Sequence, residues 1–196
     1  MNNKLVNFFF PKRFGRQGRV GRLVAAENDD LIRQALKAGV EPAEAARYSV
    51  EFFECKHTGY HTVNASSIYW ESKSGFVLSY NGRAIACTAV EVKRTHLFIK
   101  QVQGVSGFKQ ELGLLRWERL LFKIAAEYAR ALGLREARSI RSEDQRYYPE
   151  NGRSAQLDDH RQRAERMHVI YDKTPLRLGF RWSAERNAFV LPLACG

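Results

Sequence analysis

Three glycines near the middle of the chain, with a lysine and a glutamine between them, have the composition of an anion-binding turn. They are Gly104, Gly107 and Gly113, and the residues between them include Lys109 and Gln110. A glycine-bearing turn from a strand into a helix directs several free backbone N–H groups outward, at the positive end of the helix dipole. The same glycines could serve only to make the turn. Two common phosphate patterns, G-x-x-x-x-G-K-[ST] and G-x-G-x-x-G, are absent from this stretch.

The segments on either side of these glycines have the patterns of a strand and of a helix. Residues His96 to Gly104 form a short, apolar-rich run that ends in glycine, which predicts a strand. The residues after the turn place apolar side chains at helical three-and-four spacing, namely Leu114, Trp117, Leu120, Leu121, Ile124, Tyr128 and Leu132. Gly133 then stands where a helix commonly ends. The glycines are therefore expected to lie between a strand and a helix.

Two stretches of the chain resemble a known enzyme family. The run QELGLL, from Gln110 to Leu115, is similar to the acyl-CoA loop of the GNAT superfamily of N-acyltransferases, whose pattern is Gln or Arg, two residues, Gly, one residue, and Gly or Ala. The run that follows resembles the family's loop, helix, glycine and strand, and YDKTPLRLGFRW resembles its later helix and Leu-Gly-Phe turn. Two residues depart from the family: Leu115 replaces a small residue, and Pro175 falls about where a tyrosine is frequent.

This resemblance, which extends from about Arg19 to Leu193, implies a reaction and a cofactor. The reaction is transfer of an acyl group, most simply acetyl, from acetyl-CoA or another acyl-CoA to an amine. Val102 and Gly104 would pair with the pantetheine amides. The pyrophosphate would lie against the backbone of the loop residues Lys109, Gln110, Glu111, Leu112, Gly113, Leu114, Leu115 and Arg116.

The same resemblance implies two candidate catalytic residues. Tyr171 lies one helical turn before the family's usual tyrosine position, and it would donate a proton to the departing thiolate. Glu91, on the strand next to the one that enters the loop, is the candidate base. Each has a plainer interpretation, since Tyr171 could be a packing tyrosine and Glu91 an exposed strand residue.

The net charge of +11 is concentrated in two segments, which together account for the whole excess of basic residues. Residues 4–22 contain six basic residues and no acidic one, and residues 93–123 contain seven basic residues and two acidic ones. The second segment surrounds the proposed loop, which suits a ligand with several phosphates, although a solvated basic face is the alternative. Residues 1–18 are expected to form a basic arm or a strand that precedes a single domain at 19–196.

The basic arm supports a hypothesis of a different class. Phosphates attract basic side chains and bases stack on aromatic rings, and the arm combines both residue types in FFFPKRFGRQGR. The chain could therefore be a nucleic-acid-binding module on a scaffold that has lost catalysis, or an acyltransferase that acts on aminoacyl-tRNA. The sequence does not identify the amine acceptor, and it leaves monomer and homodimer open.

Composition excludes several other classes. No apolar run is long enough for a membrane span, and the three cysteines are isolated, which is typical of a reducing cytoplasm. Cys55, His57 and His61 lack a fourth metal ligand, so no metal site is expected. A length of 196 residues suits one domain with a hydrophobic core.

The remaining patterns predict an α/β (α+β) fold with a mixed, mostly antiparallel central sheet flanked by helices, as the GNAT resemblance also implies. Asn81-Gly82 predicts a tight hairpin between GFVLSY and RAIACTAVEV. Residues 19–23 are expected to form a strand, and helices are expected from Asn28 or Asp29 to Gly39 and from Pro42 to Gly59. SIYWESKSG is expected to be a polar link. Past Gly133, one further strand, a helix through Tyr171 and a terminal strand pair are expected.

A mixed-charge segment, Ser142 to Arg166, is expected to line the side of the site from which the acceptor enters. It connects the predicted fifth strand to the helix that carries Tyr171, so it ends beside the proposed chemistry. Its charges nearly balance, and its cluster Tyr147-Tyr148-Pro149 could contact a polar substrate.

Overall fold

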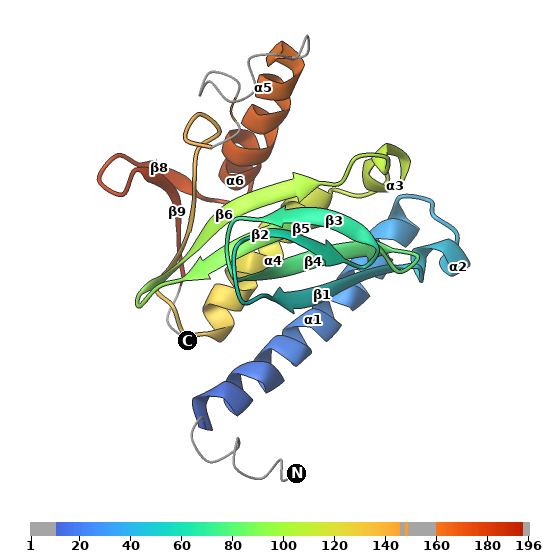
Figure 1. Cartoon of the computed structure of the whole chain (residues 1–196), viewed down its shortest axis with the longest axis horizontal. Coiled ribbons are helices and arrows are strands. Elements are labelled where there is room, and N and C mark those ends of the chain that lie inside the picture. The colour runs from blue at the N-terminus through green and yellow to red at the C-terminus, as the bar shows by residue number, and fades with distance from the viewer. Residues whose placement is uncertain (1–10, 146–147, 149–159, 194–196) are drawn as a thin grey trace.

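A computed structural model describes residues 11–145, 148 and 160–193 (Figure 1). The helices are α1 (Pro11–Lys37), α2 (Pro42–Ala45), α3 (Lys109–Gly113), α4 (Trp117–Ala131), α5 (His160–His168), the π-helical turn η2 (Val169–Lys173) and α6 (Thr174–Arg177). The strands are β1 (Tyr48–Glu54), β2 (Gly59–Val63), β3 (Ser66–Trp70), β4 (Ser74–Tyr80), β5 (Arg83–Val92), β6 (His96–Gly104), β7 (Glu136–Ser139), β8 (Arg181–Ser183) and β9 (Ala188–Pro192).

Seven of these strands form one sheet in the order β1-β4-β5-β6-β7-β9-β8. Every neighbouring pair is antiparallel except β6 and β7, which run parallel. Helix α4 lies between these two strands in the sequence, as a parallel pair requires a crossover connection. The predicted mixed, mostly antiparallel sheet flanked by helices is confirmed.

The predicted tight hairpin in the middle of the sheet is confirmed as well. Strands β4 and β5 are joined by Asn81 and Gly82, whose φ angles of 49° and 71° lie in the left-handed region. Two successive residues with positive φ form the turn whose twist matches that of antiparallel strands. Asn and Gly adopt this conformation most readily, so these two residues are sufficient to predict the turn.

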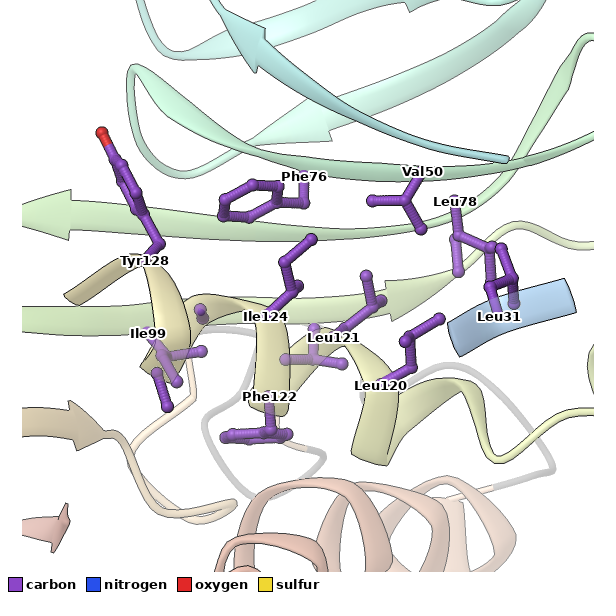
Figure 2. Packing of buried hydrophobic residues seen from close by; sticks show 14 of the residues in the cluster. Leu31, Val50, Phe76, Leu78, Ile99, Leu120, Leu121, Phe122, Ile124 and Tyr128 are labelled. Carbon is purple, nitrogen blue, oxygen red and sulfur yellow. The ribbon is translucent and has the colours of Figure 1, made fainter. Parts of the chain in front are cut away.

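One face of the sheet packs against α4 and α1 (Figure 1). The apolar side chains of α4 recur at helical spacing, so one side of the helix is buried along its length. Figure 2 shows Leu121 and Ile124 pointing toward Phe76 of β4, while Phe122 lies on the other side of the helix. There the Phe122 ring packs edge-on against Phe180, with 6.0 Å between ring centroids, and this contact links α4 to the segment before β8.

A two-stranded hairpin, β2 and β3, covers part of the opposite face (Figure 1). A second, smaller apolar cluster joins this hairpin to β4 and β5 and includes Ile68, Trp70, Val77 and Cys87. Both faces of the central strands are therefore buried. This explains why β4 and β5 read as nearly continuous apolar runs rather than alternating ones.

Three predictions for the first half of the chain are wrong. Residues 19–23 belong to helix α1 rather than to a strand, so the expected boundary at residue 18 falls inside a helix. The helix that begins at Pro42 ends at Ala45, and residues 48–54 form β1, where Tyr48 and Val50 are buried and Ser49 is exposed. The supposed polar link contains strand β3. Residues 1–10 of the expected arm lie outside the described residues, while Arg19 and Arg22 are exposed on α1.

The physical reason is that short apolar runs fit either period until their neighbours are known. Tyr48, Phe52 and Cys55 have helical spacing, yet Tyr48, Val50 and Phe52 also alternate as in a strand. Pairing with β4 along the whole of β1 decides in favour of the strand.

Two glycines make a matched test of this packing. A Cβ at Gly75 would lie 1.9 Å from the Thr88 carbonyl oxygen and 2.6 Å from the Trp70 ring, whereas a Cβ at Gly21 of α1 would meet nothing within 4 Å. We expect Gly75→Ala to lower the free energy of unfolding by about 3 kcal/mol or more through overpacking. Gly21→Ala should raise it by about 0.5–1 kcal/mol through helix propensity. Urea denaturation measures both, and equal effects of the two substitutions would contradict the packing described for Gly75.

Candidate functional site

Among the strands that the structure describes, the sheet opens between the one parallel pair, β6 and β7. Strand β7 pairs with β6 from His96 to Ile99 and then ends at Ser139, while β6 continues to Gly104. The register of β6 against β5 also shifts at this point, because Val90 lies opposite Ile99 and Ala89 opposite Gln101. Lys100 is thus the extra residue of a β-bulge, a feature that bends a strand and re-aims its side chains. The last part of β6 therefore has β5 on one side and a gap on the other.

Side chains occupy part of the gap that β7 leaves. The Gln145 amide Nε2 donates to the Lys100 carbonyl oxygen at 2.8 Å. The Tyr171 hydroxyl accepts from the Val102 backbone N–H at 2.8 Å and donates to the Val102 carbonyl oxygen at 3.0 Å. Strand alternation directs the backbone N–H and C=O of Gly104 to the same side as those of Val102. Gly104 is therefore the residue at the end of β6 whose backbone faces the gap.

Tyr171 is placed by a local break in helix geometry. Helices α5 and α6 are joined by the π-helical turn η2, which contains Tyr171. Pro175 follows and has no backbone N–H to donate, and both the N–H and the Oγ1 of Thr174 bond the Val169 carbonyl, the latter at 2.9 Å. Such π-helical turns recur at functional sites.

The Tyr171 hydroxyl is a hydrogen-bond donor that resists ionisation. The side chain is only 5% exposed, and this burial raises the pKa of Tyr171 well above its usual value. The negative charge of Glu71 raises it further, while the hydrogen bond with Val102 lowers it. Tyr171 consequently stays protonated throughout the physiological range.

A cleft of about 840 Å³ surrounds this opening. The strand–helix turn contributes Lys109, Leu112, Gly113, Leu115, Trp117 and Glu118 to its wall. Helix α5 and η2 contribute Arg163, Arg166, Met167, Ile170 and Tyr171. The β2–β3 hairpin and the residue after it contribute Tyr60, Ser67, Tyr69 and Glu71. The cleft therefore joins both faces of the sheet at the end of β6.

The structure brings most of the proposed acyl-CoA residues to this cleft. Those that line it are Val102, Gly104, Lys109, Leu112, Gly113 and Leu115, and the candidate catalytic residue Tyr171 lines it as well. Gln110, Glu111, Leu114 and Arg116 are not among its lining residues. Glu111 instead accepts a hydrogen bond from the Tyr48 hydroxyl through its carbonyl oxygen, at 3.1 Å. Arg116 lines a smaller, separate pocket with Arg119 and Lys123.

Two residues of the loop acquire a clear structural meaning. Gly113 has no positive φ, and a Cβ there would meet nothing within 4 Å, so neither backbone conformation nor packing within the protein requires a glycine. Its surface is open to a ligand. Leu115, which stands where the GNAT pattern has a small residue, packs into the main hydrophobic core and is 7% exposed.

Glu91 lies away from the cleft that contains Tyr171. It sits on β5 opposite Phe98, where it pairs with Lys93 and, at 3.6 Å, with Lys100. Hydrogen bonding from Lys93 is the main cause of a lowered pKa of Glu91. A carboxylate that holds its charge so firmly is a weak proton acceptor. Glu71 and Glu118 are the carboxylates that line the cleft instead, among the residues that the structure describes.

The cations of the cleft come mainly from a part of the chain that composition did not indicate. Of the seven basic residues between Lys93 and Lys123, only Lys109 lines it. Lys93 and Lys100 pair with Glu91, and Lys123 pairs with Glu27 and Asp30 of α1. Arg163 and Arg166 come from the charge-balanced segment. They lie with Met167 and Ile170 on one helical face, a spacing that predicts a shared surface.

A buried glutamine on β6 connects the sheet to the hairpin wall. Gln101 is 4% exposed; its Nε2 donates to the Tyr69 carbonyl at 2.7 Å and its Oε1 accepts from the Glu71 N–H at 3.1 Å. Sequence reasoning missed Gln101, Tyr69 and Glu71. The only available signal was that two polar residues, Gln101 and Gln103, alternate with apolar ones in a strand that is otherwise rich in apolar residues.

The mixed-charge segment reaches the cleft at both of its ends. Gln145, Arg163 and Arg166 line the cleft, and Ser142 bonds the Asp172 carboxylate through its N–H at 3.0 Å and its hydroxyl at 2.6 Å. Tyr147 and Pro149 lie outside the described residues. Its expected position on the acceptor side remains a prediction.

Comparisons with known proteins identify no relative: no family model, no curated protein and no solved structure matches the chain. Within the described ranges, no group of three or more His, Cys, Asp or Glu could hold a metal ion. Likewise, none of the helices described is long and apolar enough to cross a membrane.

Tyr171→Phe tests the pairing with Val102. The substitution leaves a buried N–H and C=O without their partner, so we expect the free energy of unfolding to fall by about 1–3 kcal/mol at pH 7. In the unfolded wild-type protein Tyr171 loses its proton near pH 10, whereas in the folded protein it keeps it. The contribution of Tyr171 to the free energy of unfolding therefore decreases above pH 10. The difference between the two proteins should therefore narrow there in urea titrations. A constant difference up to pH 11 would contradict the raised pKa.

Proposed function

We propose that the chain is an acyl-CoA-dependent N-acyltransferase. The observation that carries the proposal is the opening of β6 beyond Ile99, inside a cleft where the Tyr171 hydroxyl lies against the strand backbone. An extended ligand with amide groups can pair with an exposed strand edge as an added strand would. The pantetheine arm of acyl-CoA is such a ligand. A mixed sheet that opens between two parallel strands is also what the GNAT resemblance implies.

The walls of the cleft fit the charged part of acyl-CoA. Lys109, Arg163 and Arg166 line it, and arginine and lysine bind phosphate oxygens through charge-assisted hydrogen bonds. The open surface at Gly113 allows a pyrophosphate to approach the backbone of the turn. The volume of about 840 Å³ lies in the range of cofactor pockets. Acyl-CoA, when bound, supplies a thioester whose carbonyl carbon an amine can attack.

The backbone pairing is expected to use Gly104 before Val102. The Val102 N–H and C=O are both bonded to the Tyr171 hydroxyl, so a ligand could reach them only by displacing that hydroxyl. The backbone N–H and C=O of Gly104, two residues further along β6, face the same side. A pantetheine amide paired there would direct the sulfur along β6 toward Tyr171.

Tyr171 and Glu71 then have complementary roles in the reaction. The amine nitrogen forms a bond with the thioester carbonyl carbon, and the bond from that carbon to sulfur breaks. Tyr171, which stays protonated, would donate its single O–H to the leaving thiolate by turning it away from the Val102 carbonyl oxygen, which accepts it in the structure. Glu71, a carboxylate of the cleft wall whose charge acts on Tyr171, accepts the proton that the amine must lose.

Titration with acetyl-CoA tests cofactor binding. Isothermal calorimetry should show saturable binding at low salt, and Gly113→Glu should weaken it by at least ten-fold because the new carboxylate occupies and repels the phosphate position. Ala26→Glu is the matched control, since it makes the same charge change on the exposed surface of α1 and should shift affinity by less than two-fold. Absence of binding to every short-chain acyl-CoA would refute the proposal.

Kinetics distinguish the two carboxylates. We expect Glu71→Gln to lower kcat with an amine acceptor by about 100-fold, as for loss of a general base, with acetyl-CoA affinity retained. Glu91→Gln should change kcat by less than three-fold because Glu91 lies outside the cleft. The reverse pattern would restore Glu91 as the base and remove Glu71.

A further inference from the structure

The cleft carries opposite charges on different parts of its wall. The strand–helix turn and α5 present Lys109, Arg163 and Arg166. The β2–β3 hairpin and the residue that follows it present hydroxyl and aromatic groups together with the Glu71 carboxylate. A ligand with several phosphates suits the first part. The second part, which the proposed cofactor does not use, is chemically suited to a cation.

Two tyrosines form the aromatic part of the hairpin wall. Tyr60 on β2 and Tyr69 on β3 are direct cross-strand partners, and their rings meet nearly edge to face at 5.2 Å between centroids. Tyr60 is 74% exposed, so much of its ring remains open to solvent. An ammonium group is attracted to the face of such a ring.

Glu71 lines the same cleft as these rings and follows Tyr69 by two residues. Residues 69 and 71 are attached to the same buried side chain, because Gln101 bonds the Tyr69 carbonyl and the Glu71 N–H. This arrangement fixes the backbone on either side of Trp70, whose side chain is fully buried beneath the hairpin. The wall is therefore formed in advance, and a ligand need not order it on binding.

We propose that the acceptor of the acyl transfer is a primary alkylammonium, either a polyamine or a lysine side chain. It binds along the hairpin wall, with its charge between Glu71 and the rings of Tyr60 and Tyr69. This inference rests on the proposed acyltransferase function and names its substrate class. Amines that carry a carboxylate are disfavoured, because Glu71 repels them and the cations of the cleft are occupied by the phosphates.

The chemistry balances for such a substrate. An alkylammonium loses one proton to Glu71 before its nitrogen attacks, and Glu71 releases that proton to solvent. The nitrogen loses a second proton as the amide forms, and the leaving thiolate takes up one to give the free thiol. The products are an N-alkylamide, coenzyme A as its thiol, and one proton.

A panel of amines at saturating acetyl-CoA tests the proposal. Spermidine and an N-acetylated peptide amide with a single lysine are the two cationic arms, and glutamate and glycine are the comparisons that carry a carboxylate. We expect one or both cationic amines to give a kcat/KM at least ten-fold above glutamate and glycine. Spermidine alone would identify a free polyamine as the source of the amine, and the peptide alone would identify a protein lysine.

Two measurements probe binding independently of proton transfer. Choline has no N–H to lose, so it should inhibit competitively against the amine and leave the KM for acetyl-CoA unchanged. Tyr60→Leu should raise the KM for the cationic amine by about three-fold, as expected for loss of an exposed cation–π contact. Tyr60→Phe, which keeps the ring, should leave this KM within 1.5-fold of the wild-type value, and acetyl-CoA affinity should be unchanged in both variants.

The outcomes separate this inference from the function on which it rests. If acetyl-CoA binds and glutamate or glycine reacts as fast as the cationic amines, the acceptor class is wrong and the acyltransferase function stands. Lack of competition by choline, or equal effects of Tyr60→Leu and Tyr60→Phe, also overturns the hairpin wall as the binding surface. If no acyl-CoA binds, both proposals fail together.

Discussion

The hydrogen bonds between the Tyr171 hydroxyl and both backbone groups of Val102 are the interaction on which the site depends. Strand β7 ends before the sheet is complete, so the end of β6 would otherwise present backbone N–H and C=O groups to a partly buried gap. Each such group without a partner costs about 1–3 kcal/mol. In this protein the Tyr171 side chain, and not a neighbouring strand, forms the hydrogen bonds with the Val102 N–H and C=O. The sheet can therefore contain a cleft in its middle while the N–H and C=O of Val102 both keep a hydrogen-bond partner.

That arrangement requires Tyr171 to reach the strand from a helix that lies above it. The π-helical turn, the Pro175 that follows it and the bonds from Ser142 to Asp172 all contribute to its position. The Phe122–Phe180 contact attaches the segment after this turn to α4. Since α4 is itself buried against the sheet, the hydroxyl is positioned by the main hydrophobic core and not by a loop.

Many basic residues of this protein form ion pairs with nearby carboxylates, so the net charge of a segment is a poor guide to where a ligand binds. Lys123 bridges Glu27 and Asp30 and thereby holds α4 to α1. Burial raises the pKa of Glu27, so the nearby lysine compensates for a carboxylate with little access to water. Lys93 and Lys100 pair with Glu91, a more exposed carboxylate whose pKa the hydrogen bond from Lys93 lowers. Basic residues that face the cleft lie mostly on α5, in a segment whose charges nearly cancel.

The sequence by itself determined those features that depend on neighbours along the chain. Helix α4 follows from its apolar spacing, the β4–β5 hairpin from Asn81-Gly82, and the mixed sheet from strands that alternate with helices around that hairpin. Only the tertiary structure decided the site, because Tyr171 and Val102 are 69 residues apart and Gln101 and Glu71 are 30 apart. Tertiary contacts also decided three other features. Residues from Tyr48 form a strand, Glu91 lies outside the cleft, and Leu115 packs into the hydrophobic core. Local pattern leaves several conformations of similar free energy, and burial against distant segments selects among them.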